Sequence, residues 1–169
     1  GLRNSTWFTG ASYGALFEDP EPMLFGRTVT MFDEYRSAWC KHDTFRLREA
    51  RATLERSAAM SANELTSLPV ESSMYLHDFL GRRGIADVGT MYIRHSGGHS
   101  LIGLFTEHTT ISGRDMSSLR ILATQLTAFG AHLPQREPDS VRRAEQLSRR
   151  QREVADLVAQ GMSNGEIAA

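Results

Sequence analysis

The sequence predicts an α+β fold, in which helices cover both faces of a mostly antiparallel sheet, followed by the first helices of a small all-α module. Alternating segments joined by short turns indicate strands in hairpins, and the amphipathic segments between them indicate helices. Two capped helical segments at the end indicate the all-α module. We expect a domain at 1–134, a linker at 135–145 and the helical module at 146–169.

The first predicted hairpin has strands at 11–17 and 23–30. The segment 18–22 between them reads Glu-Asp-Pro-Glu-Pro and predicts a turn, because proline fixes the backbone and cannot continue a ladder. A helix is predicted at 31–39. Its apolar residues recur at helical spacing, and they are Met31, Phe32, Tyr35 and Trp39.

Two further helices are predicted before the second hairpin. The segment 43–59 is rich in Arg, Glu and Ala and predicts a mostly exposed helix with an irregular start. Ser61 and Glu64 have the spacing of a capping box. After a break at Leu68-Pro69, the segment 71–83 predicts an amphipathic helix that carries Met74, Tyr75, Phe79 and Leu80.

A second hairpin and a long helix complete the predicted domain. Strands are expected at 87–95 and 100–106, around the turn Ser96-Gly97-Gly98-His99. The long helix follows Ser112 and ends at Pro134. Its apolar stripe is either a dimer surface or buried within the monomer, and it comprises Met116, Leu119, Leu122, Ala123, Leu126, Phe129 and Leu133.

Composition narrows the class of protein. The 169 residues suit one medium-sized domain with a small appendage, and 40% hydrophobic residues suffice for a core. A net charge of −1 argues against a nucleic-acid coat or a membrane-surface protein. No apolar run approaches the roughly 18 residues of a transmembrane helix, so we expect no membrane partner. One cysteine, Cys40, forms no internal disulfide, which favours a cytoplasmic location.

The last two dozen residues contain two capped helical segments. Ser148 and Gln151 form one capping-box pattern, and Ser163 and Glu166 form the next. Gly161 stands where a helix end favours a residue tolerant of positive φ, and an apolar stripe precedes it. This pattern fits a helix-turn-helix or an ordinary helical hairpin.

The residues of this segment resemble the opening of the LuxR-type helix-turn-helix. Gln151 departs from the usual Glu of that family, and Gly165 departs from the usual Lys. The matching positions are Leu147, Ser148, Arg150, Glu153, Val154, Leu157, Val158, Ala159, Gly161, Ser163, Asn164, Glu166, Ile167 and Ala168.

The resemblance implies a DNA partner for the complete module. Ser163 would begin the bracing helix, and the groove-reading helix would follow Ala169, so we expect the sequence as it stands not to read bases. DNA contacts are expected from Arg149, Arg150, Ser163 and Asn164. The neighbouring arginines attract phosphates or form a solvated basic linker, and they include Arg142, Arg143 and Arg152.

The layout of the front domain resembles GAF/PAS-like sensors, including the autoinducer-binding domains of quorum-sensing regulators. Such domains hold a small molecule between sheet and helices. The expected ligand-binding residues are Tyr35, Trp39, Asp43 and, more weakly, Tyr92. Two of four autoinducer-motif positions match, since Met31 and Thr44 replace the Trp and the Pro. The ligand is an acyl-homoserine lactone, another apolar signal, or none. The structural alternative is a core aromatic pair with a helix-capping Asp43.

No pattern predicts an enzyme. The histidines are scattered without zinc-site spacing, and Gly97-Gly98 does not precede a helix as a phosphate loop does. We therefore expect no cofactor and no catalytic residue. The two resemblances imply a homodimeric, ligand-responsive transcriptional regulator. The alternative is a dimerising interaction protein that inhibits a full-length regulator.

Overall fold

The structure is a computed structural model that describes residues 4–18 and 22–131. The chain divides into two units, Gly1–Leu133 and Pro134–Ala169. The expected linker and helix-turn-helix lie outside the described residues and stay predictions.

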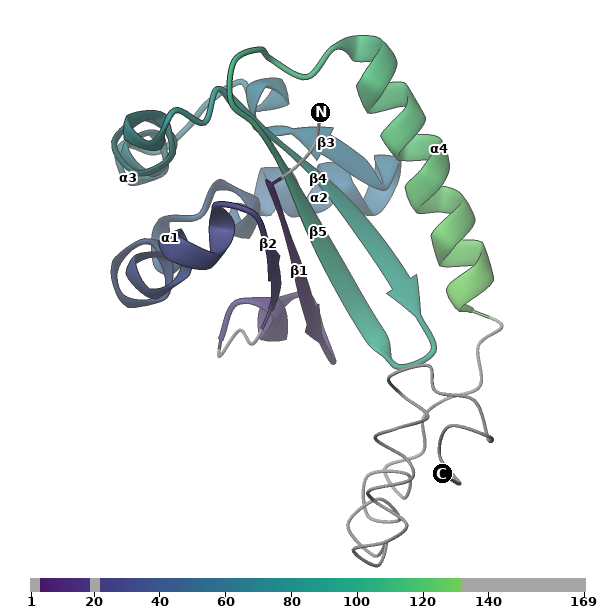
Figure 1. Cartoon of the computed structure of the whole chain (residues 1–169). Helices are drawn as coiled ribbons and strands as arrows, with labels where there is room; N and C mark the ends of the chain where they lie inside the picture. Colours follow the sequence, from purple (N-terminus) through teal and green to yellow (C-terminus); the bar gives the residue numbers. More distant parts are fainter. Residues whose placement is uncertain (1–3, 19–21, 132–169) are drawn as a thin grey trace, which may run out of the picture. The chain divides into compact units, whose positions relative to one another are not determined.

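A five-stranded antiparallel sheet forms the centre of the domain (Figure 1). Its strand order is β2-β1-β5-β4-β3, so the two long strands of the second hairpin lie in the middle. The predicted α+β class with an antiparallel sheet is confirmed. The strands are β1 (Asn4–Gly10), β2 (Met23–Phe25), β3 (Ala59–Ser61), β4 (Asp87–His95) and β5 (Gly98–Thr106).

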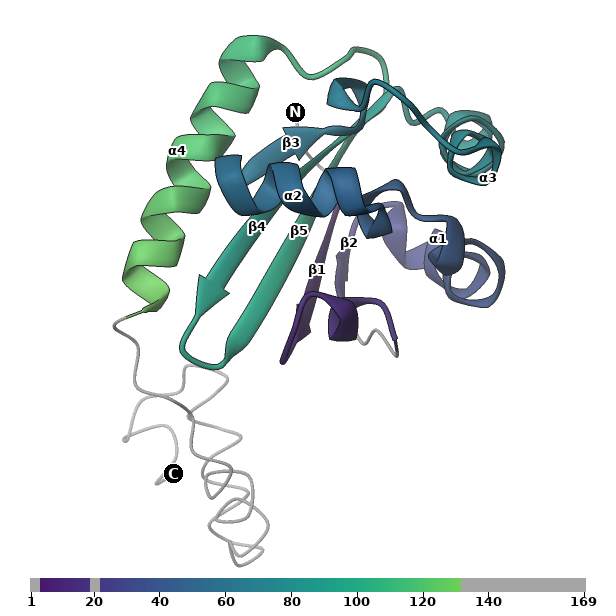
Figure 2. The ribbon, with the colours of Figure 1, turned by 180° about the vertical axis from the view of Figure 1, so that it is seen from behind.

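One face of the sheet carries α1 (Thr28–Glu34), α2 (Arg48–Ser57) and α3 (Val70–Met74). Figure 1 shows α1 and α3 on one side of the strands and α4 (Gly113–Gly130) on the other, and α2 crosses in front of the sheet in Figure 2. The π-helical turn η2 (Tyr35–Trp39) continues α1, and the π-helical turn η6 (Tyr75–Leu80) continues α3. Short 3-10 turns occur elsewhere in the chain: η1 (Gly14–Leu16), η3 (Cys40–His42), η4 (Thr44–Arg46), η5 (Ala62–Glu64) and η7 (Gly81–Arg83).

Each face of the sheet has its own hydrophobic core. The larger core lies beneath α1, α2 and α3 and includes the fully buried Leu16, Leu54 and Phe79. The smaller core lies beneath α4. At Gly89 of β4 a β-carbon would meet Ile111 at 2.6 Å, so the missing side chain makes room for the segment leading into α4. The smaller core consists of Ala59, Met91, Met116 and Ala123.

The predicted strand at 11–17 is wrong. The strand lies earlier, at Asn4–Gly10, and Gly14–Leu16 forms a 3-10 turn. Aromatic side chains explain the difference, because Tyr13 and Phe17 lie one helical turn apart and both pack into the larger core. The spacing of the apolar residues in 11–17 therefore belongs to a buried 3-10 turn and not to a strand with alternating side chains.

The second predicted strand, at 23–30, is too long. It ends at Phe25, because Gly26 takes a positive φ of 71° and Thr28 begins α1. The Thr28 hydroxyl accepts a hydrogen bond from the Phe25 N–H at 3.1 Å and donates to the Ser5 carbonyl at 2.9 Å. These bonds fix the change from strand to helix.

Among the described residues, the remaining predicted helices and the second hairpin are confirmed with shifted ends, whereas β3 was not predicted and residues 19–21 of the predicted turn lie outside the described residues. The second hairpin is formed by β4 and β5 with the turn at Ser96-Gly97. The capping box is present: Asn63 N–H donates to Ser61 Oγ at 3.2 Å, and Ser61 N–H donates to Glu64 Oε1 at 3.0 Å. Over the described residues, no helix combines the length and apolar character that crossing a bilayer requires.

Candidate functional site

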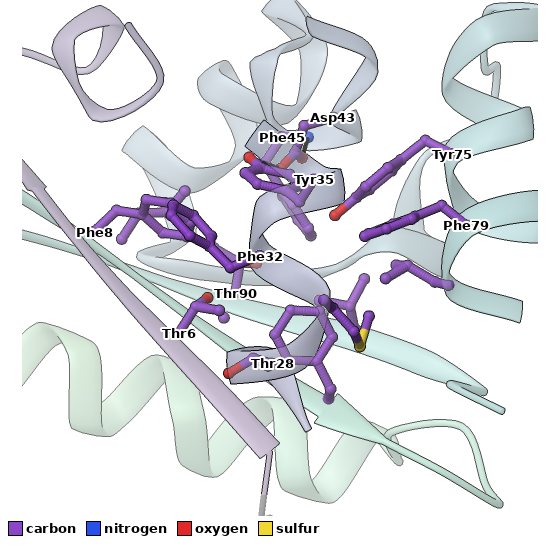
Figure 3. A pocket seen from close by; sticks show the side chains of 16 residues that line it. Thr6, Phe8, Thr28, Phe32, Tyr35, Asp43, Phe45, Tyr75, Phe79 and Thr90 are labelled. Carbon is purple, nitrogen blue, oxygen red and sulfur yellow. Dashed lines mark hydrogen bonds between the residues drawn. The ribbon is translucent and has the colours of Figure 1, made fainter. Parts of the chain in front are cut away.

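A cavity lies between the larger-core face of the sheet and the helical segments of α1 and α3 (Figure 3). Its volume is about 40 Å³, measured as the space open to the centre of a water molecule. One water needs about 10–15 Å³ by this measure, so a larger occupant requires movement of the lining side chains. Seven of the sixteen residues that line the cavity are aromatic: Phe8, Phe32, Tyr35, Phe45, Tyr75, Phe79 and Phe105.

Asp43 supplies the carboxyl group among the residues that line this cavity. The Tyr35 hydroxyl donates to Asp43 Oδ2 at 2.8 Å, and the Phe45 N–H donates to Oδ1 at 2.9 Å. Burial raises the pKa of Asp43 above its ordinary value. The Phe45 N–H, the hydroxyls of Tyr35 and Tyr75 and the charge of Arg46 oppose that rise in pKa by stabilising the carboxylate.

Local backbone geometry positions Asp43. It follows the 3-10 turn η3 and caps the next one, η4, with its side chain. The predicted alternatives of a capping residue and a cavity residue are therefore compatible, because one carboxylate does both. A buried carboxylate is costly without such hydrogen bonds.

The two tyrosines beside Asp43 each begin a π-helical turn. Tyr35 is the first residue of η2, Tyr75 is the first residue of η6, and their ring centres are 6.2 Å apart. Burial is the largest cause that raises the pKa of both phenols, followed by the nearby charge of Asp43, so both hydroxyls remain donors. π-Helical turns are rare and often occur at functional sites.

The floor of the cavity is formed by the sheet. Thr6 of β1 and Thr90 of β4 contribute hydroxyl groups, and Gly103 of β5 pairs with both threonines. A β-carbon on Gly103 would lie 2.7 Å from Thr6 Oγ1 and 3.3 Å from the Phe105 ring. The missing side chain of Gly103 therefore leaves room for the Thr6 hydroxyl and the Phe105 ring in this part of the floor.

Two of the four predicted ligand-binding residues, Tyr35 and Asp43, line the cavity together. Trp39 lies behind the wall: its ring stacks on Phe79 at 5.6 Å, and its indole N–H donates to Glu34 Oε1 at 3.1 Å. Tyr92 lies elsewhere in the larger core, where its ring stacks on His99 at 5.6 Å. Ligand binding by any of the four stays a prediction.

Sequence reasoning did not assign several residues that line the cavity. Tyr75 and Phe79 were placed on an amphipathic helix but not in a site, because they are far from Asp43 in the chain. Phe8 and Thr6 were missed because the first strand was predicted too late in the sequence. The helical spacing of Phe32, Tyr35, Tyr75 and Phe79 was the pattern that could have indicated two facing aromatic walls.

The expected DNA-contacting residues Arg149, Arg150, Ser163 and Asn164 lie outside the described residues. Among the residues that the structure describes, no group of three or more His, Cys, Asp or Glu side chains could hold a metal ion. The chain matches no protein-family model and no curated protein.

Proposed function

We propose that this protein is a ligand-responsive transcriptional regulator of the LuxR type that acts in the cytoplasm. The domain at 1–134 senses a small molecule, and the module at 146–169 belongs to the DNA-binding part. The observation that carries the sensor role is the aromatic cavity with the buried Asp43 carboxylate at one wall. The DNA-binding role rests on the sequence resemblance of residues 147–168.

The cavity chemistry defines the class of ligand. A carboxylate has about four acceptor positions; Phe45 and Tyr35 occupy two, and Tyr75 interacts with the same group. A remaining position favours a ligand N–H or O–H donor. The aromatic walls favour an apolar or aromatic body. A compact molecule of this kind fits best, because a long acyl chain requires the rings to move apart.

Coupling to DNA requires two states of the protein. A ligand shifts their populations only if it binds one state more tightly. In the proposed regulator, the distance of α1 and α3 from the sheet differs between the state with an occupied cavity and the state with an empty one. The difference in the free energy of ligand binding between the two states is the free energy available for control of the DNA module.

Ligand binding is tested on the chain purified from its host. Native mass spectrometry is expected to detect a bound small molecule, and a ligand at 100 times its Kd stabilises the protein by about 2.7 kcal/mol. The panel comprises acyl-homoserine lactones, quinolones, fatty acids and small aromatic amides. Absence of both a bound mass and a thermal shift across this panel contradicts the sensor role.

A matched pair of variants locates the site. Asp43→Asn is expected to weaken binding of a donor-bearing ligand about tenfold or more, since a charge-assisted hydrogen bond is replaced by a neutral one. Asp78→Asn is the control, because Asp78 is a partly exposed carboxylate that pairs with Arg82 at 3.5 Å and does not line the cavity. Equal affinities for both variants remove Asp43 from the site.

DNA control is tested separately with a protein that includes the groove-reading helix. Fluorescence anisotropy with an operator fragment is expected to change by tenfold or more in Kd when the signal is added. An unchanged Kd, despite demonstrated ligand binding, rejects the regulatory role while leaving the sensor intact.

A further inference from the structure

The residues that line the cavity are nearly all buried. Of the sixteen, Phe32 is half-buried and the others are buried. A molecule that enters must therefore displace part of a wall. The walls differ in how they are held, and that difference indicates which of them can move.

Backbone hydrogen bonds hold two of the walls. The floor is the continuous ladder of β1, β5 and β4. At another wall, the Asp43 carboxylate accepts from the Phe45 N–H, and the Tyr13 hydroxyl donates to the Phe45 carbonyl. Displacing either wall leaves buried polar groups without partners, which is costly.

Side chains close a third wall, where α3, η6 and η7 meet α1 and η2. In the described part of the chain, no backbone hydrogen bond joins these two segments. The backbones of α3, η6 and η7 approach the other described helices and strands sparsely, and segments of low contact density open most readily. In Figure 3, Tyr75 and Phe79 lie opposite Tyr35 across this junction, at ring distances of 6.2 Å and 6.3 Å. We call the junction the η2–η6 seam.

Three residues that do not line the cavity cover the η2–η6 seam. Trp39 of η2 stacks on the Phe79 ring at 5.6 Å, and the Arg83 guanidinium lies over the same ring at 4.4 Å. Glu34 joins them, because its Oε1 accepts from the Trp39 indole N–H at 3.1 Å and its Oε2 pairs with Arg83. We call Glu34, Trp39 and Arg83 the seam clasp.

We propose that the η2–η6 seam is the entrance of the cavity and that the seam clasp is its gate. This inference rests on the proposed sensor role, because it assigns the route by which a signal molecule reaches the same cavity. The Glu34 side chain is 50% exposed and that of Arg83 is 29% exposed, and ion pairs that solvent reaches are weak. The seam clasp therefore opens without unfolding of the domain.

The contacts of Arg83 define which part moves. Arg83 donates to the Phe79 carbonyl at 2.7 Å, so it stays attached to η6 when it leaves Glu34. The Arg27 guanidinium donates to the Arg83 carbonyl at 3.3 Å and pairs with Glu107, which tethers the end of η7 to the sheet. In the open state, η6 carries Phe79 away from the cavity, while α1 and η2 keep their place.

Thiol labelling of the full chain, without any ligand, tests the entrance. Thr90→Cys places a thiol on the cavity floor, and Cys40→Ala removes the one natural cysteine. Methyl methanethiosulfonate reaches the new thiol only when the cavity opens, so the rate of labelling, followed by mass spectrometry, reports the opening. Val88→Cys replaces Thr90→Cys as the cavity reporter if circular dichroism shows that the latter does not fold.

Two variants remove the ion pair of the seam clasp. Glu34→Gln and Arg83→Met are each expected to raise the labelling rate about fivefold, because neither new side chain can form the pair. Salt at about 1 M should accelerate labelling of the protein with the intact clasp and leave the Glu34→Gln rate unchanged. Glu55→Gln is the matched control and should not change the rate, because it breaks the exposed Arg51–Glu55 pair on α2, away from the cavity lining.

A second reporter separates local opening from unfolding of the whole domain. Ala123→Cys, again with Cys40→Ala, places a thiol in the smaller core on the opposite face of the sheet, where Ala123 is fully buried. Its labelling rate should not change with Glu34→Gln.

The proposal is overturned if Glu34→Gln and Arg83→Met both leave labelling of the cavity reporter unchanged. It is also overturned if Glu55→Gln accelerates that labelling equally, or if the reporters in both cores accelerate together. An unchanged rate alongside a signal molecule found by native mass spectrometry rejects the entrance and keeps the sensor role. Faster labelling without any bound signal rejects the sensor role and keeps the entrance, so the two failures are distinguishable.

Discussion

The Asp43 side chain links stability to pH through its burial. Its pKa is raised above the ordinary 3.8, first by desolvation, so the folded state holds the proton more tightly than the unfolded chain does. The tighter proton binding of the folded state therefore contributes its full stabilisation at pH values below the pKa of Asp43 in the unfolded chain. This stabilisation is lost as pH rises from that value through the raised pKa of the folded state.

Asp43→Asn removes this dependence. An amide keeps an acceptor for the Phe45 N–H and has no charge to desolvate, so the variant should gain stability relative to wild type as pH rises above about 4. Thermal unfolding of both proteins from pH 3 to pH 8 measures the difference. Parallel curves would mean that the carboxylate ionises in the folded protein as easily as in the unfolded chain.

Gly103 offers a second test at the scale of one residue. Gly103→Ala places a β-carbon against Thr6 Oγ1, and such overpacking costs about 1–3 kcal/mol. Thr6→Ala removes the clashing oxygen, so the double variant should recover part of the loss, and the coupling is read from urea unfolding of all four proteins.

Gly113→Ala is the control for this pair. A β-carbon at Gly113 meets nothing within 4 Å, and the residue is the first of α4. Alanine there should be neutral or should stabilise by up to about 1 kcal/mol. Additive effects of Gly103→Ala and Thr6→Ala would show that the two side chains do not compete for space.

At the scale of elements, local chemistry explains which predictions succeeded. α4 was predictable because Ser112 caps it and its apolar residues repeat over several turns. The second hairpin was predictable from its glycine turn. The first strand was misplaced because Tyr13, Leu16 and Phe17 are apolar in any conformation, and tertiary packing selected a 3-10 turn for them.

The candidate site was only partly predictable for a related reason. Asp43 and Tyr35 lie close enough in sequence for their types and spacing to indicate shared chemistry. Tyr75 reaches the same carboxylate from another helical segment, and that contact depends on how both π-helical turns pack on the sheet. No local pattern reports such a distance.

The N-cap of α4 can be tested directly. Ser112 Oγ accepts from the Asp115 N–H at 3.2 Å, so Ser112→Ala should lower the free energy of unfolding by about 0.5–2 kcal/mol. Ser118→Ala is the matched control, because its exposed hydroxyl only donates to the Arg114 carbonyl within the helix. Equal effects in calorimetry would show that the cap contributes nothing specific.

At the scale of the whole molecule, all residues of both hydrophobic cores lie in the part of the chain from β1 to α4, with β1 and α4 included. The boundary between the two units falls just after them, between Leu133 and Pro134. A domain that contains its own core is expected to fold alone.

Removal of residues 134–169 should therefore leave a folded domain. We expect its unfolding midpoint to lie within about 3 °C of the midpoint of the whole chain, because both described cores lie within the residues that remain. Scanning calorimetry of both proteins measures this. A drop of about 10 °C or an uncooperative transition would show that the domain depends on the removed segment.

Strand β5 separates two very different surroundings with a single layer of backbone. Leu101, Gly103 and Phe105 line the cavity, whereas Ile102 and Leu104 point to the opposite side. Neighbours in one strand share their peptide groups, so a displacement of Phe105 by an occupant also displaces Leu104. A structural change caused by an occupant of the cavity would thus reach the opposite face of the sheet through the backbone of one strand, without a chain of side-chain contacts.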